Sequence, residues 1–179
     1  FYRRPGPDTP WNKETIPSSL ADTQHYDALA VTKDGVLHAI VSDAEHWISR
    51  LVHRHAGGWE IESTTEQAHF KYPLILMADA AGGLWFPIAS RVLGYRLNGV
   101  LTRYDLAPHD FGLGFSCLTE DAEGNLWAGT ARSGLVCLLP GRIRNLGIEQ
   151  GLPDPKARAL LEASDGTLWA GTDGGVVQL

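Results

Sequence analysis

The sequence predicts an all-β fold, a β-propeller of about four blades, and three observations support this prediction. A glycine-centred pattern occurs four times along the 179 residues. Turn signals bound short apolar segments of strand length in each copy, and no segment shows the 3.6-residue apolar period of a long helix. Repeats of just over forty residues are typical of propeller blades and of paired-helix units, and the short segments favour the propeller.

The four copies align on a turn glycine, at intervals of 47, 42 and 42 residues. Asp-Gly at 34–35 and at 165–166 indicates a tight hairpin in which the glycine has a positive φ. A tryptophan follows that glycine by three residues in three copies, and the last two copies share Gly-x-Leu-Trp-Ala-Gly-Thr. The repeat positions are Gly35, Gly82, Trp85, Gly124, Trp127, Gly129, Gly166, Trp169 and Gly171.

The strand after each turn is apolar on both faces. Side chains alternate along a strand, so Leu168 and Ala170 lie on one face, while Trp169 and Gly171 lie on the other. A blade stacked between two neighbours buries both of its faces. We therefore expect each tryptophan to fill the space between blades, burying about 200 Å², and Gly171 to allow a close approach of the backbone.

The repeats predict four blades at approximately 17–63, 64–105, 106–146 and 147–179. Each blade is a meander of antiparallel strands. The outer strands of the first three blades lie at 59–63, 100–105 and 143–146, and the last blade ends after three strands. Either residues 1–16 supply its outer strand, through 11–16, and close a small ring, or the chain is an open arc of a larger ring. We expect the arc. Departures from the pattern fall in the first two copies, where His38 replaces tryptophan and Pro87 removes a ladder donor.

Composition and charge exclude several partners. The net charge of −6 and the scattered basic residues do not favour nucleic acid or an anionic membrane surface. No apolar run approaches the roughly 20 residues that span a bilayer, so we expect no membrane insertion of this segment. Cys117 and Cys137 are expected on the first and third strands of one blade, about 9–10 Å apart, too far for a disulfide.

No pattern predicts catalysis, a cofactor or a metal ion. His53 and His55 share a strand face, but two ligands do not make a zinc site and no further ligand cluster lies nearby. Glu120 and Asp121 precede a repeat glycine, where turn chemistry explains them.

Candidate ligand-binding residues lie in the loops that enter the first strand and leave the second strand of the blades. Aromatic and arginine side chains there can stack on sugars or pair with an acidic ligand, although they can equally cover ordinary loop surface. Arg91 and Arg132 follow the second strands of successive blades and are expected at the same rim. The candidates are His46, Trp47, Arg91, His109 and Arg132.

Residues 147–176 resemble the two-component regulator propeller repeat, which has a Gly-Leu-Pro lead-in, an apolar strand, an Asp-Gly or Glu-Gly turn and Leu-Trp-x-Gly-Thr. The preceding copy matches from Gly124 to Leu135, including its Gly-Leu turn. The positions that match in the last copy are Gly151-Leu152-Pro153, Asp165-Gly166, Leu168-Trp169, Gly171-Thr172 and Gly174-Gly175.

The resemblance implies a sensor. Propellers of that family lie in the periplasm, ahead of a transmembrane helix and a histidine kinase, cyclase or DNA-binding output. It implies an unknown small ligand, of which oligosaccharides are one class. It also implies a signalling domain in the same longer polypeptide, and it allows a homodimer. Since fold alone does not secure function, these remain expectations.

Two other functions compete with the sensor. Residues 82–97 are similar to the Gly-x-Leu-Trp-Phe repeat of streptogramin-inactivating propeller lyases, which would need a histidine base and a carboxylate that holds Mg²⁺. His109 with Asp110 is the pair that such an enzyme could use. A scaffold for protein interaction, without a small ligand, is the third reading.

Overall fold

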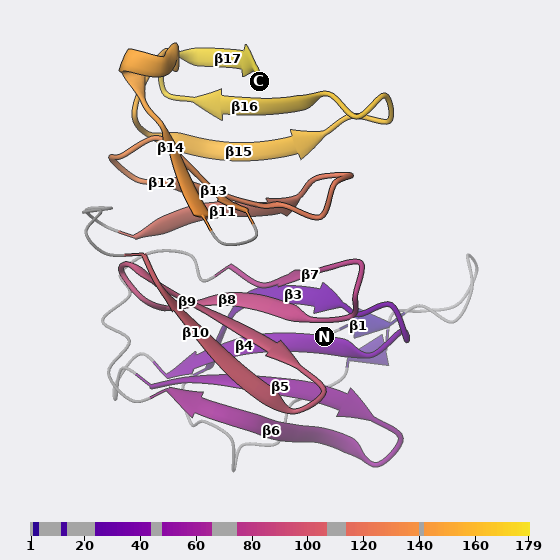
Figure 1. Cartoon of the computed structure of the whole chain (residues 1–179). Helices are drawn as coiled ribbons and strands as arrows, with labels where there is room; N and C mark the ends of the chain where they lie inside the picture. Colours follow the sequence, from indigo (N-terminus) through magenta and orange to yellow (C-terminus); the bar gives the residue numbers. More distant parts are fainter. Residues whose placement is uncertain are drawn as a thin grey trace.

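The structure is a computed structural model that describes residues 2–3, 12–13, 24–43, 48–65, 75–106, 114–139 and 142–179. Across these residues the strands form one two-stranded sheet, three four-stranded sheets and one three-stranded sheet. Figure 1 shows the larger sheets stacked in chain order, from β3–β6 to β15–β17. This arrangement confirms the predicted all-β propeller arc, and we number its blades 1 to 4 from the amino terminus.

Each blade is an antiparallel meander in which consecutive strands pair. The first strands of neighbouring blades contact each other, β3 with β7 and β11 with β15, so the blades converge along their first strands. Blade 1 consists of β3 (Gln24–Val31), β4 (Leu37–Asp43), β5 (Ile48–His55) and β6 (Gly58–Thr65). Blade 2 consists of β7 (Met77–Ala78), β8 (Leu84–Ala89), β9 (Val92–Leu97) and β10 (Val100–Asp105).

The last two blades follow the same order. Blade 3 consists of β11 (Phe115–Glu120), β12 (Leu126–Thr130), β13 (Leu135–Leu139) and β14 (Arg142–Leu146). A single 3-10 turn, η2 (Ile148–Gln150), leads into blade 4, which consists of β15 (Ala157–Glu162), β16 (Leu168–Thr172) and β17 (Gly175–Gln178). The outer strands β6, β10 and β14 confirm the three segments predicted for that position.

The repeat glycines form one hairpin turn, built four times in the described chain. In each copy the glycine N–H donates to the carbonyl of the residue three positions earlier, as from Gly124 to Asp121 at 2.9 Å. That residue's own N–H donates to the residue after the glycine, as from Asp121 to Asn125 at 3.0 Å. The four glycines have φ between 79° and 87°, which is the left-handed conformation that this turn requires.

Hydrophobic cores lie between successive blades because the strands are apolar on both faces. On β12, Leu126 and Ala128 pack into the cluster shared with blade 2, whereas Trp127 packs into the cluster shared with blade 4. On β13 the adjacent Leu135 and Val136 divide between the same two clusters. The predicted alternation is therefore confirmed for blade 3.

A second repeated contact joins blades 2 to 3 and 3 to 4. The carboxylate of Glu120 accepts a hydrogen bond from the turn N–H of Ala80 in the preceding blade, at 2.7 Å. Glu162 accepts from Ala122 in the same way, at 2.9 Å. These four residues occupy equivalent repeat positions, so each glutamate fixes the turn of the blade before it.

The end blades each leave one apolar face exposed. Leu29 and Val31 are exposed on β3, on the face opposite to the one that packs on blade 2, and Leu161 on β15 and Val176 on β17 are exposed in the last blade. End blades with one neighbour each are what an open arc requires.

The outer strand suggested for blade 4 from residues 11–16 is described only at Asn12–Lys13, and beyond these two residues it stays a prediction. Within the described residues, β1 (Tyr2–Arg3) and β2 (Asn12–Lys13) pair with each other, and the sheet of blade 4 ends at β17. Two short segments that satisfy each other's backbone groups have fewer groups left to pair with a third strand.

Cys117 and Cys137 form no disulfide. Cys117 lies opposite Gly129, and Cys137 lies opposite Trp127, so β12 separates them as predicted. In the part of the chain that the structure describes, we find no helix with the length and apolar character needed to cross a bilayer.

Candidate functional site

In blades 1 to 3 the residue three positions after the turn glycine faces the next blade. In blades 2 and 3 this residue is a tryptophan, held by an aspartate that lies three positions before the glycine. Trp85 donates its indole N–H to Asp79 at 3.1 Å, and Trp127 donates to Asp121 at 2.7 Å. The indoles are thus structural elements of the blade interfaces, as the sequence predicted.

The carboxylate of Asp121 organises its own turn as well. It accepts hydrogen bonds from the backbone N–H of Asn125 at 2.7 Å and from the Asn125 amide at 3.0 Å. Partial burial opposes ionisation of Asp121, but the hydrogen bonds from Asn125 and Trp127 lower its pKa below the ordinary value. The carboxylate therefore remains charged at neutral pH, with its acceptor sites occupied.

We predict that Asp121→Ala lowers the free energy of unfolding by about 2 kcal/mol, because it leaves the indole and Asn125 donors without their acceptor. Urea denaturation measures the loss. Asp165→Ala is the matched control, since Asp165 lies in the equivalent turn of blade 4 and its side chain accepts from Thr167 N at an exposed position. Equal losses for the two variants would contradict the assignment.

Trp169 departs from the expectation that every repeat tryptophan is buried between blades. It is 38% exposed, and Ala163 stands where blades 2 and 3 have the aspartate. The indole lies on the face of β16 that no further blade covers in this structure. Trp85 and Trp127 are partly buried against the next blade, so the expectation is met at those two positions.

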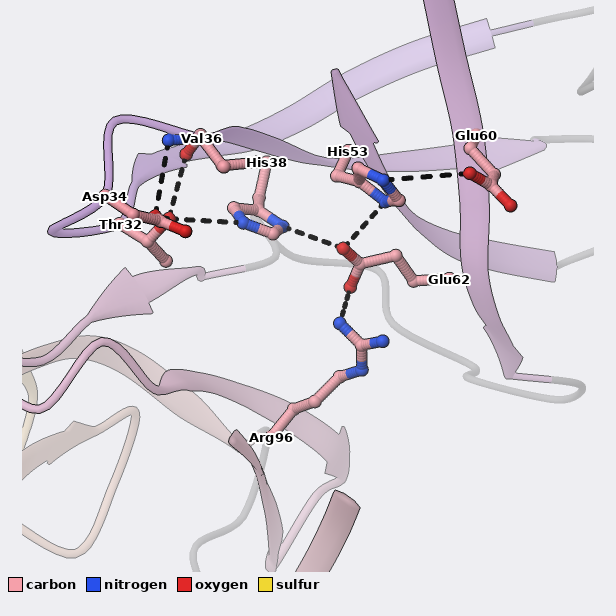
Figure 2. Close-up of polar contacts among 8 residues, drawn as sticks. All are labelled: Thr32, Asp34, Val36, His38, His53, Glu60, Glu62 and Arg96. Carbon is pink, nitrogen blue, oxygen red and sulfur yellow. Dashed lines mark hydrogen bonds and ion pairs between the residues drawn. The ribbon is translucent and has the colours of Figure 1, made fainter. Parts of the chain in front are cut away.

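Blade 1 replaces the aspartate–tryptophan pair with Thr32 and His38. Thr32 Oγ1 lies 3.4 Å from His38 Nε2 and donates to Asp34 at 2.6 Å. His38 on β4 lies opposite His53 on β5, which in turn lies opposite Glu60 on β6. A polar row thus crosses the face of blade 1 that packs on blade 2 (Figure 2).

Glu62 is the centre of this cluster. It is the extra residue of a β-bulge in β6, because Ile61 pairs with Val52 and Ser63 pairs with Leu51. A bulge re-aims a side chain, and here the Glu62 carboxylate is only 4% exposed. Figure 2 shows it pointing between the two imidazoles and toward blade 2.

Three side chains surround the Glu62 carboxylate. Its Oε1 lies 3.2 Å from His38 Nδ1 and 2.8 Å from His53 Nδ1, but neither ring nitrogen has the alignment of a regular hydrogen bond. Arg96, from β9 of blade 2, contacts Oε2 through its guanidinium. We define Glu62, His38, His53 and Arg96 as the interblade charge cluster.

The charges in this cluster favour an ionised Glu62. Burial alone would raise the pKa of Glu62, but the contact with His38 and the positive charge of Arg96 together bring the pKa below its ordinary value of 4.5. A buried carboxylate paired with a guanidinium is favourable only when both partners remain in place. Chemically, the cluster is a polar joint between blades 1 and 2.

We expect the joint to weaken in acid. A lowered pKa in the folded state means that ionised Glu62 contributes stability above its ordinary pKa of 4.5, and that this contribution disappears as the pH falls through the lower folded value. The midpoint of urea denaturation should therefore fall more steeply below pH 4.5 in the native chain than in Glu62→Gln. Other carboxylates titrate in both proteins, so only the difference between the two curves reports on Glu62. Parallel curves would contradict the prediction.

The structure places only two of the loop-face candidates. Arg91 lies between β8 and β9, where it approaches Asp105 at 3.3 Å, and Arg132 lies exposed between β12 and β13. Both follow the second strand of their blade. His46, Trp47 and His109 lie outside the described residues.

The histidines expected on one strand face do lie on β5, beside Glu60. Its Oε2 lies 3.8 Å from His53 Nε2 and 3.9 Å from His55 Nε2. Among the described residues, no group of three or more His, Cys, Asp or Glu side chains has the arrangement of a metal site. Glu62 and Arg96 were not predicted from the sequence. The signal that could have pointed to them is His38, a polar residue at a position that is otherwise tryptophan.

Comparisons with known proteins agree with this architecture. The family described as two component regulator propeller matches residues 111–132 and 151–174. No curated protein matches the chain.

Solved structures share the fold at low identity. The extracellular domain of a putative hybrid two component system from B. thetaiotaomicron has a TM-score of 0.68 at 12% identity, covering 96% of this chain and 24% of that one. The extracellular domain of a putative one component system from the same organism has a TM-score of 0.65 at 17% identity, covering 84% of this chain and 21% of that one. Virginiamycin B lyase from Staphylococcus aureus has a TM-score of 0.66 at 19% identity, covering 93% of this chain and 58% of that one.

At these identities the likeness shows the fold alone, and the chain spans less than two thirds of each of those structures. The family match is more specific, because it falls on the two blades whose Leu-Trp-Ala-Gly-Thr strands, β12 and β16, have the same structure. Two segments of this chain match the two component regulator propeller, and they contain strands β12, β15 and β16 of its last two blades.

Proposed function

We propose that this chain is the ligand-sensing propeller of an extracytoplasmic signalling protein, which transmits its binding state to an output domain in the same polypeptide. The observation that carries the proposal is the match of blades 3 and 4 to the two component regulator propeller. Support comes from the extracellular domains of putative one component and hybrid two component systems that share the fold.

The use of the carboxylates supports a role in binding rather than catalysis. Asp79, Asp121, Glu120 and Glu162 are each engaged in turns or blade contacts, and Glu62 is paired with Arg96. A general acid or base must be free to contact a substrate, whereas these carboxylates hold the turns and the blade contacts. The exposed arginines at the rim, Arg91 and Arg132, are the groups that we assign to ligand contact.

A fusion tests this proposal. The chain is placed ahead of the transmembrane segment and kinase of a characterised two component system, with a transcriptional reporter, and is challenged with digests of polysaccharides. We expect reporter output that depends on a digest and is lost in the Arg91→Gln/Arg132→Gln double variant. Arg103→Gln, a change at an exposed position on β10, is the matched control.

Two results would overturn the proposal. One is an output that no digest changes, together with capture of a defined protein partner, which would indicate an interaction scaffold. The other is a fusion that functions only when the propeller faces the cytoplasm, as measured by alkaline phosphatase fusions. We do not propose a lyase, because similarity to virginiamycin B lyase shows the fold alone and His109 with Asp110 lies outside the described residues.

A further inference from the structure

The side of blade 3 that faces blade 4 carries a pocket of about 500 Å³ beside Trp127. This volume lies within the range of about 300–1,000 Å³ that small-molecule sites occupy. The loop-face arginines do not line the pocket, and the interblade charge cluster lies at a different blade interface. The pocket is therefore a separate feature of the molecule.

At the pocket, blade 3 has a small side chain where blade 2 has an aromatic ring. In blade 2 the residue opposite Trp85 is Tyr95, whose ring stacks on the indole with centroids 4.3 Å apart. In blade 3 the residue opposite Trp127 is Cys137. A thiol is too short to cover the indole. Asn125 stands where blade 2 has Gly83, against which the Tyr95 ring lies, so Asn125 and Cys137 together line the space beside Trp127.

The aromatic wall of the pocket is held in place. Asp121 accepts hydrogen bonds from the Trp127 indole and from the Asn125 amide, at 2.7 and 3.0 Å. With its N–H occupied, Trp127 lines the pocket as an apolar aromatic ring, which suits the apolar face of a ligand ring. Asn125 retains its amide oxygen as an acceptor, while Gln150 uses Oε1 for Gly147 N at 2.7 Å and retains its amide donors.

The rim of the pocket has a positive charge that no lining residue neutralises. Arg144 on β14 lies opposite Cys137 and is exposed. No acidic side chain lines the pocket, and within the described residues Arg144 has no ion-pair partner. A guanidinium binds carboxylates through charge-assisted, bidentate hydrogen bonds. The pocket thus combines a flat apolar wall, amide groups and one cation.

We propose that this pocket binds a sugar acid, a monocyclic ligand whose apolar face stacks on Trp127 and whose carboxylate pairs with Arg144. Ring hydroxyls both donate and accept, so they complement the oxygen of Asn125 and the donors of Gln150. The inference rests on the proposed sensing function for its biological use and adds a second binding place to it, away from the loop face.

Isothermal titration of the 179-residue chain with D-glucuronate, D-galacturonate, D-glucose and benzoate tests this assignment. We expect at least one of the two uronates to bind, and D-glucose to bind about tenfold more weakly or not at all, since it lacks the carboxylate. Arg144→Gln should weaken uronate binding about tenfold. Cys137→Tyr should abolish binding, because it puts a phenol ring into the pocket that Cys137 lines. Arg103→Gln should bind as the native chain does.

The assignment is overturned if neither uronate binds at millimolar concentration, or if binding is unchanged in a folded Cys137→Tyr protein. It is also overturned if benzoate binds more tightly than both uronates, since the hydroxyl contacts would then be absent. Should Cys137→Tyr fail to fold, as judged by circular dichroism, unchanged affinity in Arg144→Gln decides against the proposal. A chain that binds a uronate but gives no output in the kinase fusion would refute signalling alone.

Discussion

Glu62→Ala is expected to lower the free energy of unfolding by about 3 kcal/mol, because it removes the anion from a buried pair and leaves the guanidinium of Arg96 uncompensated. Arg96 is 23% exposed and Glu62 is 4% exposed, so the loss should lie at the lower end of the range for a fully buried pair. The two imidazoles of the cluster lose their anionic neighbour in the same variant. Equilibrium denaturation in urea at pH 7 measures the change.

Glu60→Ala is the matched control, since it removes the same side chain from the same strand. Glu60 is 65% exposed and approaches His53 only at 3.8 Å, so we expect a change within about 0.5 kcal/mol. Replacing both Glu62 and Arg96 by leucine should recover at least half of the stability, because well-packed apolar residues can substitute for a buried ion pair. Equal effects of the two alanine variants would show that the cluster does not hold blades 1 and 2 together.

Gly134→Ala is the second change for which we expect a large effect, about 3 kcal/mol of destabilisation. Gly134 lies between β12 and β13 with φ of 79°, a conformation that costs an alanine energy. A Cβ atom there would also run into the carbonyl oxygen of Leu146 and lie 3.0 Å from its carbonyl carbon. The obstacle is backbone, so it cannot rotate away. The turn N–H, which donates to Pro155 at 2.8 Å, ties blade 3 to the lead-in of blade 4.

Gly124→Ala separates the two contributions. Gly124 has the same φ of 79°, but its Cβ would meet only the end of the Glu120 side chain, at 3.8 Å. We therefore expect a loss of about 1 kcal/mol from backbone strain alone. Thermal denaturation followed by circular dichroism compares the variants, and a loss for Gly134→Ala no larger than that for Gly124→Ala would contradict the clash.

The fold could be predicted from the sequence because its determinants are local and repeated. An Asp-Gly turn, an alternating strand and a tryptophan at a fixed offset each have a direct structural meaning, and four copies reinforce one another. The outer strand at Val100–Asp105 has the bounds of β10 as predicted. The role suggested for residues 11–16 was less secure, because pairing between segments far apart in the sequence leaves no local signal.

The interblade charge cluster could not be predicted because it depends on register and on contacts between blades. Glu62 is the extra residue of a bulge in β6, between the residues that pair with Val52 and Leu51, and a bulge of this kind changes no composition. Arg96 joins it from the next blade, 34 positions along the chain. Similarly, the absence of a ring at Cys137 has meaning only after Tyr95 is seen stacked on Trp85 in the equivalent place.

The glutamate links between neighbouring turns have a consequence for how such a protein could grow. The unit of blade 3 offers an amide at its turn to the unit after it, from Ala122 to Glu162, and supplies a carboxylate to the unit before it, from Glu120 to Ala80. A tandem duplication of this unit would therefore bring both halves of a new joint with it. Lengthening of the array by gene duplication would need no compensating substitutions at this contact.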